Sequence, residues 1–315
     1  MSDSDKKNLK LIEEIHFQDN DAKNIDWKSK AKILCEALPY MKRFAGEFFV
    51  IKIGGSAMGD KKMLKNFAQN IVLLKQVGIN PIIIHGGGPQ IGDMLEKLQI
   101  KSSFVDGMRV TGKDAVKIVE MVLSGSINKE IVQAITEAGG MAIGISGKDG
   151  GLVSAKKLHR THRDPDSNIE KILDLGYVGE PCNVNPNVLL GFDNSDFIPV
   201  IAPIGTGSRG ETYNINADTV AGAVAGAINA CKLIILSDID GVKADGEVIS
   251  DLNVAMAKKL IDKKIINGGM IPKVRTCIKA IESEVGYAHI LNGLVENILL
   301  MEIFTDQGVG TMISY

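Results

Sequence analysis

The chain lacks the residues and segments from which disulfide-rich, zinc-bound and membrane-spanning proteins are built. Its 4 cysteines lie far apart and form no C-x-x-C pair, which argues against a zinc site and a disulfide framework. The N-terminal segment Met1–Glu14 is charged and has no apolar core, so it is not typical of a signal peptide. No apolar stretch approaches the roughly 18 residues that a membrane helix needs. These absences predict a cytoplasmic protein that does not contact a membrane.

The chain also lacks a surplus of positive charge. With 36 Lys and Arg against 38 Asp and Glu, the formal net charge is −2, and no overall basic field attracts nucleic acid. The richest basic run is Lys156–Arg163, which contains no aromatic residue and is predicted to be a solvated loop or hairpin. We therefore expect no nucleic-acid partner.

Two common nucleotide-binding motifs are missing or incomplete. Gly112-Lys113 and Gly147-Lys148 are each followed by Asp, so no G-x-x-x-x-G-K-[ST] motif exists and a P-loop ATPase is excluded. A G-x-G-x-x-G spacing occurs at Gly205, Gly207 and Gly210, but no helix opens directly at it and no acidic residue lies about twenty positions on. We interpret it as a chance match in a polar loop, which disfavours a nicotinamide-dependent dehydrogenase.

Short apolar runs of strand length alternate with helical periodicity along most of the chain. In 315 residues with 45% hydrophobic content, this alternation predicts an α/β fold, a three-layer αβα sandwich with a central, mainly parallel sheet. The segment Gly147–Gly191 is Gly-rich, basic and then Pro/Asn-rich, and it is expected to form hairpins that project from the sheet. The predicted strands are Phe48–Ile53, Pro81–His85, Ala142–Ser146, Phe197–Pro203, Lys232–Asp238 and Ala288–Leu291.

Two of these strands end in glycine-rich turns that suit phosphate. Phe48–Ser56 delivers Lys52 and then two glycines, while Asn80–Gly88 ends in His-Gly-Gly-Gly and is followed by Pro89, which suits the first turn of a helix. Glycines let backbone N–H groups approach an anion, and a lysine adds a full positive charge. Each turn alone is equally well explained as a strand-to-helix turn that needs positive φ. The two together favour phosphate binding.

Two later segments supply further polar chemistry. Tyr213–Asp218 places three short polar side chains at two-residue spacing before the small-residue run Thr219–Ala227, which is predicted to be a tightly packed helix. Helix N-capping by Asn216 or Asp218 explains one of the three side chains but not all of them. Gly268–Lys273 combines a glycine turn with a lysine at a helix start, where the helix dipole opposes the positive charge unless an anion lies there.

The segment before the first core strand has a different character. Lys28–Phe44 carries apolar residues at helical spacing and is predicted to be an amphipathic helix interrupted at Pro39. This helix either caps its own domain or packs on another subunit. Residues 1–27 are polar and are expected to be poorly ordered or loosely helical.

Six motifs occur in order along the chain. They are Lys-Ile-Gly-Gly at 52–55, His-Gly-Gly-Gly at 85–88, Gly-Met-Arg-Val-Thr at 107–111, Tyr-Asn-Ile-Asn-Ala-Asp at 213–218, Gly-Gly-Met-Ile-Pro-Lys at 268–273 and a C-terminal Glu-Ile-Phe-Thr-Asp-Gln-Gly-Val-Gly-Thr. Together, from about Tyr40 to Ile313, they resemble the amino acid kinase family. The resemblance implies an N-terminal extension at 1–45 and a domain of the amino acid kinase fold at 46–315. That domain would have an acceptor-binding half at about 46–230 and a nucleotide-binding half at about 231–315.

The resemblance implies ATP-dependent phosphorylation of a carboxylate. By this pattern Lys52 and Lys273, with N–H groups around Gly54, Gly55 and Gly87, hold the transferring phosphoryl group. Asp218 orients both lysines rather than taking a proton. Mg²⁺ is expected to be bound through the nucleotide phosphates, with no dedicated protein ligands. The implied ATP-binding residues are Gly54, Gly55, Ser237, Asp238, Gly241, Gly268, Gly269 and Met270.

Arg109, inside its motif, indicates the branch of the family that acts on N-acetyl-L-glutamate in the second step of arginine biosynthesis. A glutamate side chain, with a pKa of about 4.3, is already ionised at neutral pH, so the acceptor needs no general base. Arg109 can clamp the α-carboxylate bidentately, and Asn214 can hydrogen-bond nearby. Gly87, Gly88 and Asn216 complete the implied acceptor site. The alternatives are another amino acid kinase, such as a glutamate 5-kinase, and a non-catalytic amino-acid-sensing module on the same fold.

The N-terminal helix adds an expectation about assembly. Ala37–Tyr40 resembles the helix that interlaces dimers in arginine-inhibited hexameric members of the family. The resemblance implies a homo-hexamer built as a trimer of dimers, with arginine as effector, and leaves a PII-type regulator open. The implied effector-site residues are Tyr40, Lys232, His289, Glu302 and Gly308. The plainer alternative makes Lys232 and Glu302 surface residues and His289 a satisfied strand histidine.

The chain departs from the family pattern at two places. Pro181-Cys182-Asn183 differs from the usual continuation near the substrate lid. At Asn292-Gly293-Leu294 the glycine lacks the acidic and basic neighbours that are common there, and this departure is expected to weaken regulation.

Overall fold

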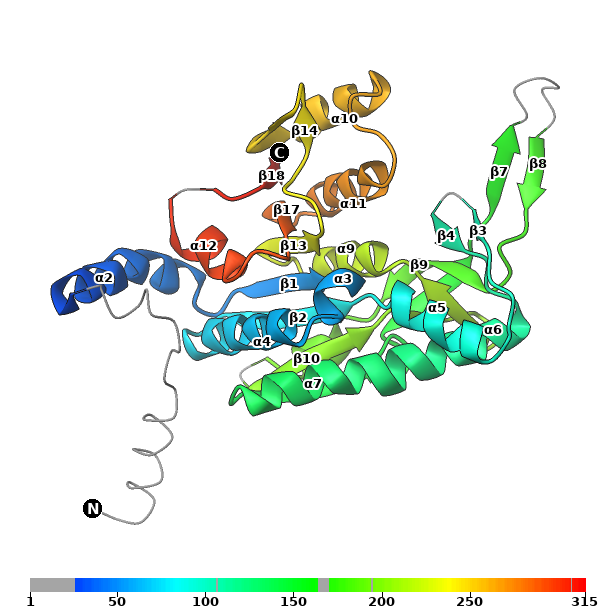
Figure 1. The fold of residues 1–315 in the computed structure, drawn as a ribbon, viewed down its shortest axis with the longest axis horizontal. Helices are drawn as coiled ribbons and strands as arrows, with labels where there is room; N and C mark the ends of the chain where they lie inside the picture. The colour runs from blue at the N-terminus through cyan, green and yellow to red at the C-terminus, as the bar shows by residue number, and fades with distance from the viewer. Residues whose placement is uncertain (1–25, 106, 164–169, 194, 307) are drawn as a thin grey trace, which may run out of the picture. The chain divides into compact units, whose positions relative to one another are not determined.

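The computed structural model describes residues 26–105, 107–163, 170–193, 195–306 and 308–315 (Figure 1). The chain divides into two compact units, Met1–Arg43 and Phe44–Tyr315. The predicted order of residues 1–27 concerns positions that lie almost entirely outside the described residues. Within the described part, no helix is both long and apolar enough to cross a bilayer.

In the described part of the N-terminal unit lies the amphipathic helix α2 (Trp27–Phe44), whose last residue already belongs to the larger unit. The Asp26 carboxylate caps it by accepting hydrogen bonds from the N–H groups of Lys28 at 2.8 Å and Ser29 at 3.1 Å. The predicted interruption at Pro39 is wrong, because the helix continues through this residue. Proline removes one intrahelical donor, and the turns on both sides retain enough hydrogen bonds to hold the helix.

The larger unit is built on an eight-stranded sheet with the order β16-β18-β17-β13-β1-β2-β10-β5. All of its described pairings are parallel except that between β17 and β18. The prediction of a mainly parallel sheet is therefore confirmed, and each predicted strand is found to within one residue at either end. The strands are β16 (Asp251–Asn253), β18 (Thr311–Ser314), β17 (Tyr287–Asn292), β13 (Lys232–Ser237), β1 (Phe48–Ile53), β2 (Asn80–His85), β10 (Phe197–Ala202) and β5 (Met141–Ser146).

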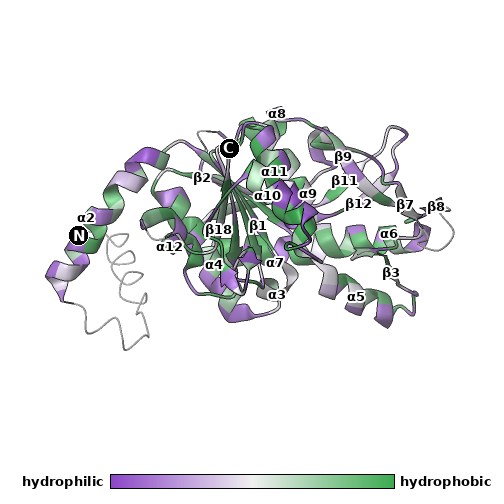
Figure 2. Cartoon of the chain, turned by 90° about the horizontal axis from the view of Figure 1, so that it is seen from above, coloured by the Kyte–Doolittle hydropathy of each residue, from purple (hydrophilic) through white to green (hydrophobic). Residues whose placement is uncertain are grey.

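Helices cover both faces of this sheet, as the predicted three-layer sandwich requires (Figure 1). On one face, α4 (Lys61–Gln76) contacts β2, and α7 (Asn128–Glu137) contacts β5 and β10. On the other face, α9 (Ala217–Ala227) contacts β1 and β13, and α11 (Met270–Glu282) contacts β13 and β17. The strands between the layers are mostly apolar, whereas polar residues gather on the outer sides of the helices (Figure 2).

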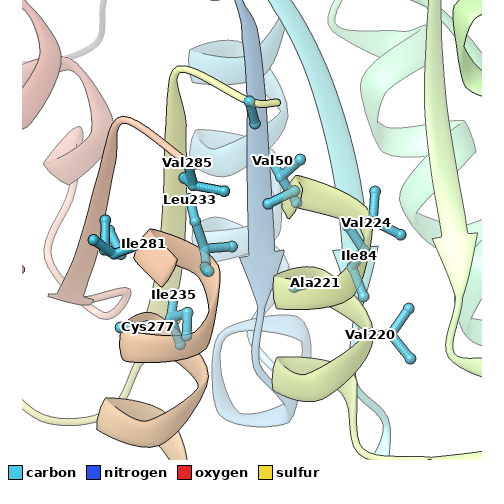
Figure 3. Close-up of a cluster of buried hydrophobic side chains, with 14 of the residues drawn as sticks. Val50, Ile84, Val220, Ala221, Val224, Leu233, Ile235, Cys277, Ile281 and Val285 are labelled. Carbon is cyan, nitrogen blue, oxygen red and sulfur yellow. The ribbon is translucent and has the colours of Figure 1, made fainter. Parts of the chain in front are cut away.

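The core beneath α9 and α11 is apolar and buried. Figure 3 shows aliphatic side chains of β1, β2 and β13 facing those of the two helices. The labelled members are Val50, Ile84, Val220, Ala221, Val224, Leu233, Ile235, Cys277, Ile281 and Val285. Each of them is at most 3% exposed, so this layer fixes where the two helices begin relative to the ends of the strands.

The remaining helices are short or lie at the margins of the sheet. They are α3 (Gly55–Met58), α5 (Gly88–Lys97), α6 (Lys113–Glu120), the π-helix η2 (Met121–Ile127), the 3₁₀ turn η3 (Asp149–Gly151), α8 (Asn187–Leu190), α10 (Val254–Asp262) and α12 (Ile298–Phe304). α6 runs directly into the π-helical segment η2, which in turn continues into α7.

Hairpins occupy the segment predicted to project from the sheet. The strands β6 (Val153–Lys157), β9 (Val178–Val184), β11 (Ile204–Thr206) and β12 (Thr212–Ile215) close into a small barrel. Further two-stranded pairings join β7 (Arg160–Arg163) to β8 (Glu170–Leu173), β3 (Phe104–Val105) to β4 (Met108–Arg109), and β14 (Lys243–Ala244) to β15 (Glu247–Val248).

These hairpins settle two sequence interpretations. The G-x-G-x-x-G spacing lies in the β11–β12 hairpin, where a strand rather than a helix follows it, so it is not a dinucleotide turn. The divergent segment Pro181–Asn183 lies within β9 and pairs with β6.

Two glycines of α9 let it approach α11 closely. A Cβ atom on Gly222 would lie 2.7 Å from Thr276 Cγ2, and one on Gly226 would lie 2.9 Å from Ser283 Cβ. Real Cβ atoms do not make contacts that short, because packed atoms repel strongly there. The close crossing therefore depends on these positions having no side chain.

We expect Gly222→Leu to destabilise the fold by about 1–3 kcal/mol through overpacking. The matched control is Gly125→Leu in η2, where nothing lies within 4 Å of an added Cβ. Urea unfolding followed by far-UV circular dichroism compares the two variants. Equal midpoints would contradict the packing argument.

Candidate active site

One buried carboxylate holds two lysines at the carboxyl edge of the central sheet. Lys52 comes from β1, Asp218 from the first turn of α9 and Lys273 from the first turn of α11. Lys52 Nζ lies 2.9 Å from Asp218 Oδ1, and Lys273 Nζ donates to Asp218 Oδ2 at 2.8 Å. The three side chains are between 7% and 17% exposed. The structure thus brings together the three residues predicted to be catalytic.

The electrostatics of this group favour an ionised Asp218. Burial alone would raise the pKa of the carboxyl, but the charges of Lys52 and Lys273 and their hydrogen bonds outweigh burial, and the pKa lies below its ordinary value. Asp218 is therefore a poor proton acceptor at neutral pH. It is also the anion that Lys273 needs at the start of α11, where the helix dipole alone would disfavour a cation. The predicted role of Asp218 in orienting the two lysines stays a prediction, and it requires the contacts described above.

The two glycine turns adjoin one another beside the lysines. The N–H of Gly86 donates to Ile53 O at 3.0 Å, and a Cβ on Gly55 would lie 2.8 Å from Pro89 Cδ. The close approach of the turns therefore depends on a glycine at position 55. A pocket of about 180 Å³ opens here, lined by Lys52, Gly54, Gly55, Leu236, Ser237, Asp238 and Lys273.

This pocket lies where the topology of the sheet favours ligand binding. β1 pairs with β2 on one side and with β13 on the other, so the connections that leave β1 and β13 run in opposite directions along the sheet. Ligands of open α/β sheets bind at such a switch point, beyond the carboxyl ends of the strands. The pocket's lining comes from the ends of β1 and β13, at this point.

The predicted ATP-binding residues divide into two groups. Gly54, Gly55, Ser237 and Asp238 line the pocket, whereas Gly241, Gly268, Gly269 and Met270 are not among its described lining. Gly268 has a φ of +53°, Gly269 is the N-cap of α11, and Met270 is its first residue. Gly241 has a φ of +148° and lies against Thr311. Contact of these four residues with a nucleotide stays a prediction.

Arg109 lies in a second, larger cleft beside the glycine turn. Its guanidinium donates through Nη2 to Gly88 O at 2.8 Å and through Nη1 to Ser102 Oγ, and it lies 4.5 Å from the centre of the Phe104 ring. Arg109 is only 9% exposed. The cleft has a volume of about 740 Å³ and is lined by Gly88, Pro89, Gly92, Asp93, Glu96, Ile100, Ser102, Phe104 and Arg109.

Ser102 and Phe104 were not found by sequence reasoning. Neither belongs to a motif, and the β3–β4 pairing that places Phe104 opposite Arg109 involves strands of only two residues. Such short strands give no periodic signal in a sequence.

The three polar residues of the motif at 213–218 have three different surroundings. The Asn214 amide donates to Thr111 Oγ1 at 3.3 Å, and Thr111 in turn donates to Arg109 O at 3.0 Å, so Asn214 is linked to the Arg109 motif. The Asn216 carboxamide oxygen accepts from the N–H of Thr219 at 3.1 Å and caps α9. Asp218 holds the two lysines. Helix capping thus explains one residue of the three, and contact of Asn214 and Asn216 with an acceptor stays a prediction.

Three of the predicted effector-site residues form a buried chain of contacts. Lys232 Nζ lies 3.1 Å from His289 Nε2, and His289 Nδ1 lies 2.9 Å from Glu302 Oε1. Glu302 Oε2 accepts from the N–H of Val309, next to Gly308, at 3.0 Å. Burial lowers the pKa of His289 in spite of its bond to Glu302, so a neutral ring that joins the lysine to the carboxylate fits the geometry.

Lys232 and Glu302 are therefore not ordinary surface residues. Lys232 is 7% exposed and the Glu302 side chain 8% exposed. Tyr40 belongs to the other compact unit, Met1–Arg43.

Asn292, in the second segment that departs from the family pattern, holds the turn after β17. Its amide donates to Asp240 Oδ1 at 2.9 Å, and its side-chain oxygen accepts from the N–H of Leu294 at 3.0 Å.

The model for the amino acid kinase family matches residues 47–292. The fold and the lysine–carboxylate site belong to a class of phosphotransferases, and this chain belongs to the amino acid kinase family. The resemblance seen in the six motifs is thereby confirmed.

The chain is similar to several proteins described as acetylglutamate kinase. It is 57% identical to that of Rhodospirillum rubrum over 91% of this chain and 93% of the relative, and 55% identical to that of Rhodospirillum centenum over 91% and 95%. The protein of Ehrlichia chaffeensis is 52% identical over 92% and 91%. The similarity thus spans nearly the whole length of this chain and of each relative.

Solved structures share the fold at lower identity. The N-acetylglutamate synthase of Neisseria gonorrhoeae, complexed with coenzyme A and N-acetyl-glutamate, has a TM-score of 0.77 at 24% identity, over 90% of this chain and 63% of that longer chain. The carbamate kinase of Giardia has a TM-score of 0.63 at 18% identity, over 86% and 99%. Both confirm the predicted fold class.

We expect Lys52→Ala and Lys273→Ala each to reduce kcat by roughly a hundredfold or more, because each removes a charge that stabilises the transferring phosphoryl group. Lys258→Ala is the matched control, since Lys258 pairs with Glu282 on the surface and has a half-exposed side chain. Release of ADP in a coupled assay measures kcat, and circular dichroism checks that each variant is folded. Near-normal turnover of both active-site variants would refute the assignment.

Proposed function

We propose that this protein transfers the γ-phosphoryl group of ATP to the side-chain carboxylate of N-acetyl-L-glutamate, the second step of arginine biosynthesis. The observation that carries the proposal is the pair of lysines held by Asp218 next to the glycine turns and to the Arg109 cleft. The relatives described as acetylglutamate kinase, at 51–57% identity over about nine tenths of the chain, support the same reaction.

The chemistry of this reaction consists mainly of managing charge. The acceptor carboxylate is already ionised at neutral pH and attacks without a general base. An anionic nucleophile then approaches an anionic phosphoryl group, so positive charge at the reacting atoms lowers the barrier. Lys52 and Lys273 supply two positive charges and Asp218 one negative charge, and the group carries a net charge of +1.

The pocket suits a phosphate chain. It combines two lysines with the backbone of Gly54 and Gly55, where no side chain stands in the way. Among the described residues, no group of three or more His, Cys, Asp or Glu could hold a metal ion. We therefore assign Mg²⁺ to the nucleotide phosphates, where it would neutralise charge on the phosphoryl oxygens.

Arg109 supplies the recognition of the acceptor. Its buried guanidinium is held in place by Gly88 O and Ser102 Oγ, so it offers a pre-oriented fork to a carboxylate in the cleft. Gly87, Gly88, Asn214 and Asn216 would complete the site. An acceptor with two carboxylates could place one on Arg109 and the other near the lysines.

We expect Arg109→Lys to raise KM for N-acetyl-L-glutamate by about tenfold or more, because lysine keeps the charge but cannot form two parallel hydrogen bonds. KM for ATP should change by less than about twofold. Initial rates with each substrate varied in turn measure both constants, and the same assay with L-glutamate as acceptor tests the alternative substrate. An equal rise in both KM values would mean that Arg109 does not bind the acceptor.

We further propose that arginine inhibits the enzyme and that the assembly is a hexamer built as a trimer of dimers. The buried contacts of Lys232, His289 and Glu302 combine a cation with a carboxylate, and a carboxylate of this kind could pair with a guanidinium. Apolar residues of α2 support a role for this helix between subunits: Trp27, Ile33, Leu34 and Leu38 are 54–74% exposed. Tyr40 and Gly308 would complete the effector site.

Deleting residues 1–43 should convert the hexamer into dimers that keep catalytic activity and respond weakly to arginine, because an effector acts only through states that differ in their affinity for it. This deletion keeps Phe44, whose ring packs edge-on against the ring of Phe49 with 5.2 Å between the ring centres. Light scattering measures the mass, and an arginine titration of activity measures the response. A truncated protein that stays hexameric and fully sensitive would contradict the role of α2.

A further inference from the structure

A buried histidine lies directly before the glycine turn of the proposed acceptor site. His85, the last residue of β2, and Asn128, the first residue of α7, are both 0% exposed. His85 Nδ1 lies 2.8 Å from Gly86 O, and Asn128 Nδ2 lies 3.3 Å from His85 Nε2. The Asn128 amide also donates to Val200 O at 2.9 Å, and this contact ties the pair to β10.

The contacts of this pair fix its donors and acceptors. Lys129 Nζ, which can only donate, lies 3.2 Å from Asn128 Oδ1, so the other terminal atom of the Asn128 side chain is the amide nitrogen. A carbonyl oxygen only accepts, so Nδ1 of His85 must carry the proton that it shares with Gly86 O. His85 Nε2 is then the acceptor for the Asn128 amide. Burial lowers the pKa of His85 to about 4, so the ring is neutral at pH 7.

This hydrogen bond fixes the direction of the next backbone donor. The C=O of Gly86 and the N–H of Gly87 belong to one planar trans peptide unit and point in opposite directions. Since Gly86 O is held at the His85 ring, the N–H of Gly87 points away from it. The turn is also confined by η2, because a Cβ on Gly87 would lie 2.7 Å from Leu123 Cδ2. π-Helical segments within α-helices often occur at functional sites.

We propose that His85 and Asn128 are positioning residues, which hold the turn at 86–88 so that the N–H of Gly87 is directed at the phosphoryl group during transfer. This inference rests on the proposed function, because it assigns a role within that reaction. Neither side chain touches the reacting atoms. Each acts through the peptide unit between Gly86 and Gly87.

Two amide variants of His85 separate the positioning role from a structural one. The amide of His85→Asn falls near the position of Nδ1 and can still donate to Gly86 O, whereas that of His85→Gln falls near the position of Nε2 and can contact only Asn128. We expect His85→Gln to lower kcat by about tenfold or more, because a donor to the transition state is no longer oriented. KM for ATP should stay within about twofold, and His85→Asn should keep kcat within about threefold of the wild type.

A purely structural role predicts a different pattern. Both variants would then lose thermal stability and kcat to the same degree, and that result would overturn the proposal. Wild-type kcat in a folded His85→Gln variant would overturn it as well.

A second measurement needs no active variant. Long-range ¹H–¹⁵N spectra of the protein labelled at its 5 histidines report which ring nitrogen carries the proton. The His85 signal is the one absent from His85→Asn, or, if that variant does not fold, from His85→Gln. We expect the Nδ1–H form between pH 8 and pH 6, and an Nε2–H form would overturn the proposal. Wild-type protein that fails to phosphorylate N-acetyl-L-glutamate would refute the proposed function instead, and the tautomer would be measured all the same.

Discussion

The ion pairs of Asp218 with Lys52 and Lys273 constrain how β1, α9 and α11 meet. Three charges are taken out of water, and each ion is stabilised only while the others stay within hydrogen-bond distance. Removing one partner from such a buried group typically costs about 3–5 kcal/mol. The elements that carry these residues must therefore meet accurately. The small residues of α9 allow this, because they let the helix lie close to both the sheet and α11.

The carboxyl edge of the sheet and its amino edge carry different polar groups on the same strand. Lys232 begins β13 and contacts His289, whereas Ser237 ends β13 and lines the small pocket. A strand of 6 residues spans about 17 Å between its first and last Cα atoms. Any influence of the buried Lys232 group on the pocket would have to pass along β13, which pairs with β17 over its whole length and with β1 over its first four residues.

Much of the fold and part of the site could be predicted from the sequence because their signals are local. Each core strand is a short apolar run, and Lys52 with its glycines is contiguous in the chain. Contacts between distant segments could not be predicted in this way. His85 and Asn128 are 43 positions apart, and nothing near either residue indicates the other. The predicted interruption at Pro39 was wrong for a different reason. The loss of one hydrogen bond is small beside the other hydrogen bonds of an 18-residue helix.

The composition of α9 has a consequence for how the active site comes into existence. The helix reads Ala-Asp-Thr-Val-Ala-Gly-Ala-Val-Ala-Gly-Ala, and with only 11 residues, two of them glycine, it has little stability of its own in spite of its alanines. It persists because Val220, Ala221 and Val224 are wholly buried against the sheet and α11. Asp218 therefore reaches its lysines only when the surrounding core has closed. Catalytic competence in this molecule is a property of the finished tertiary structure, acquired with it and lost with it.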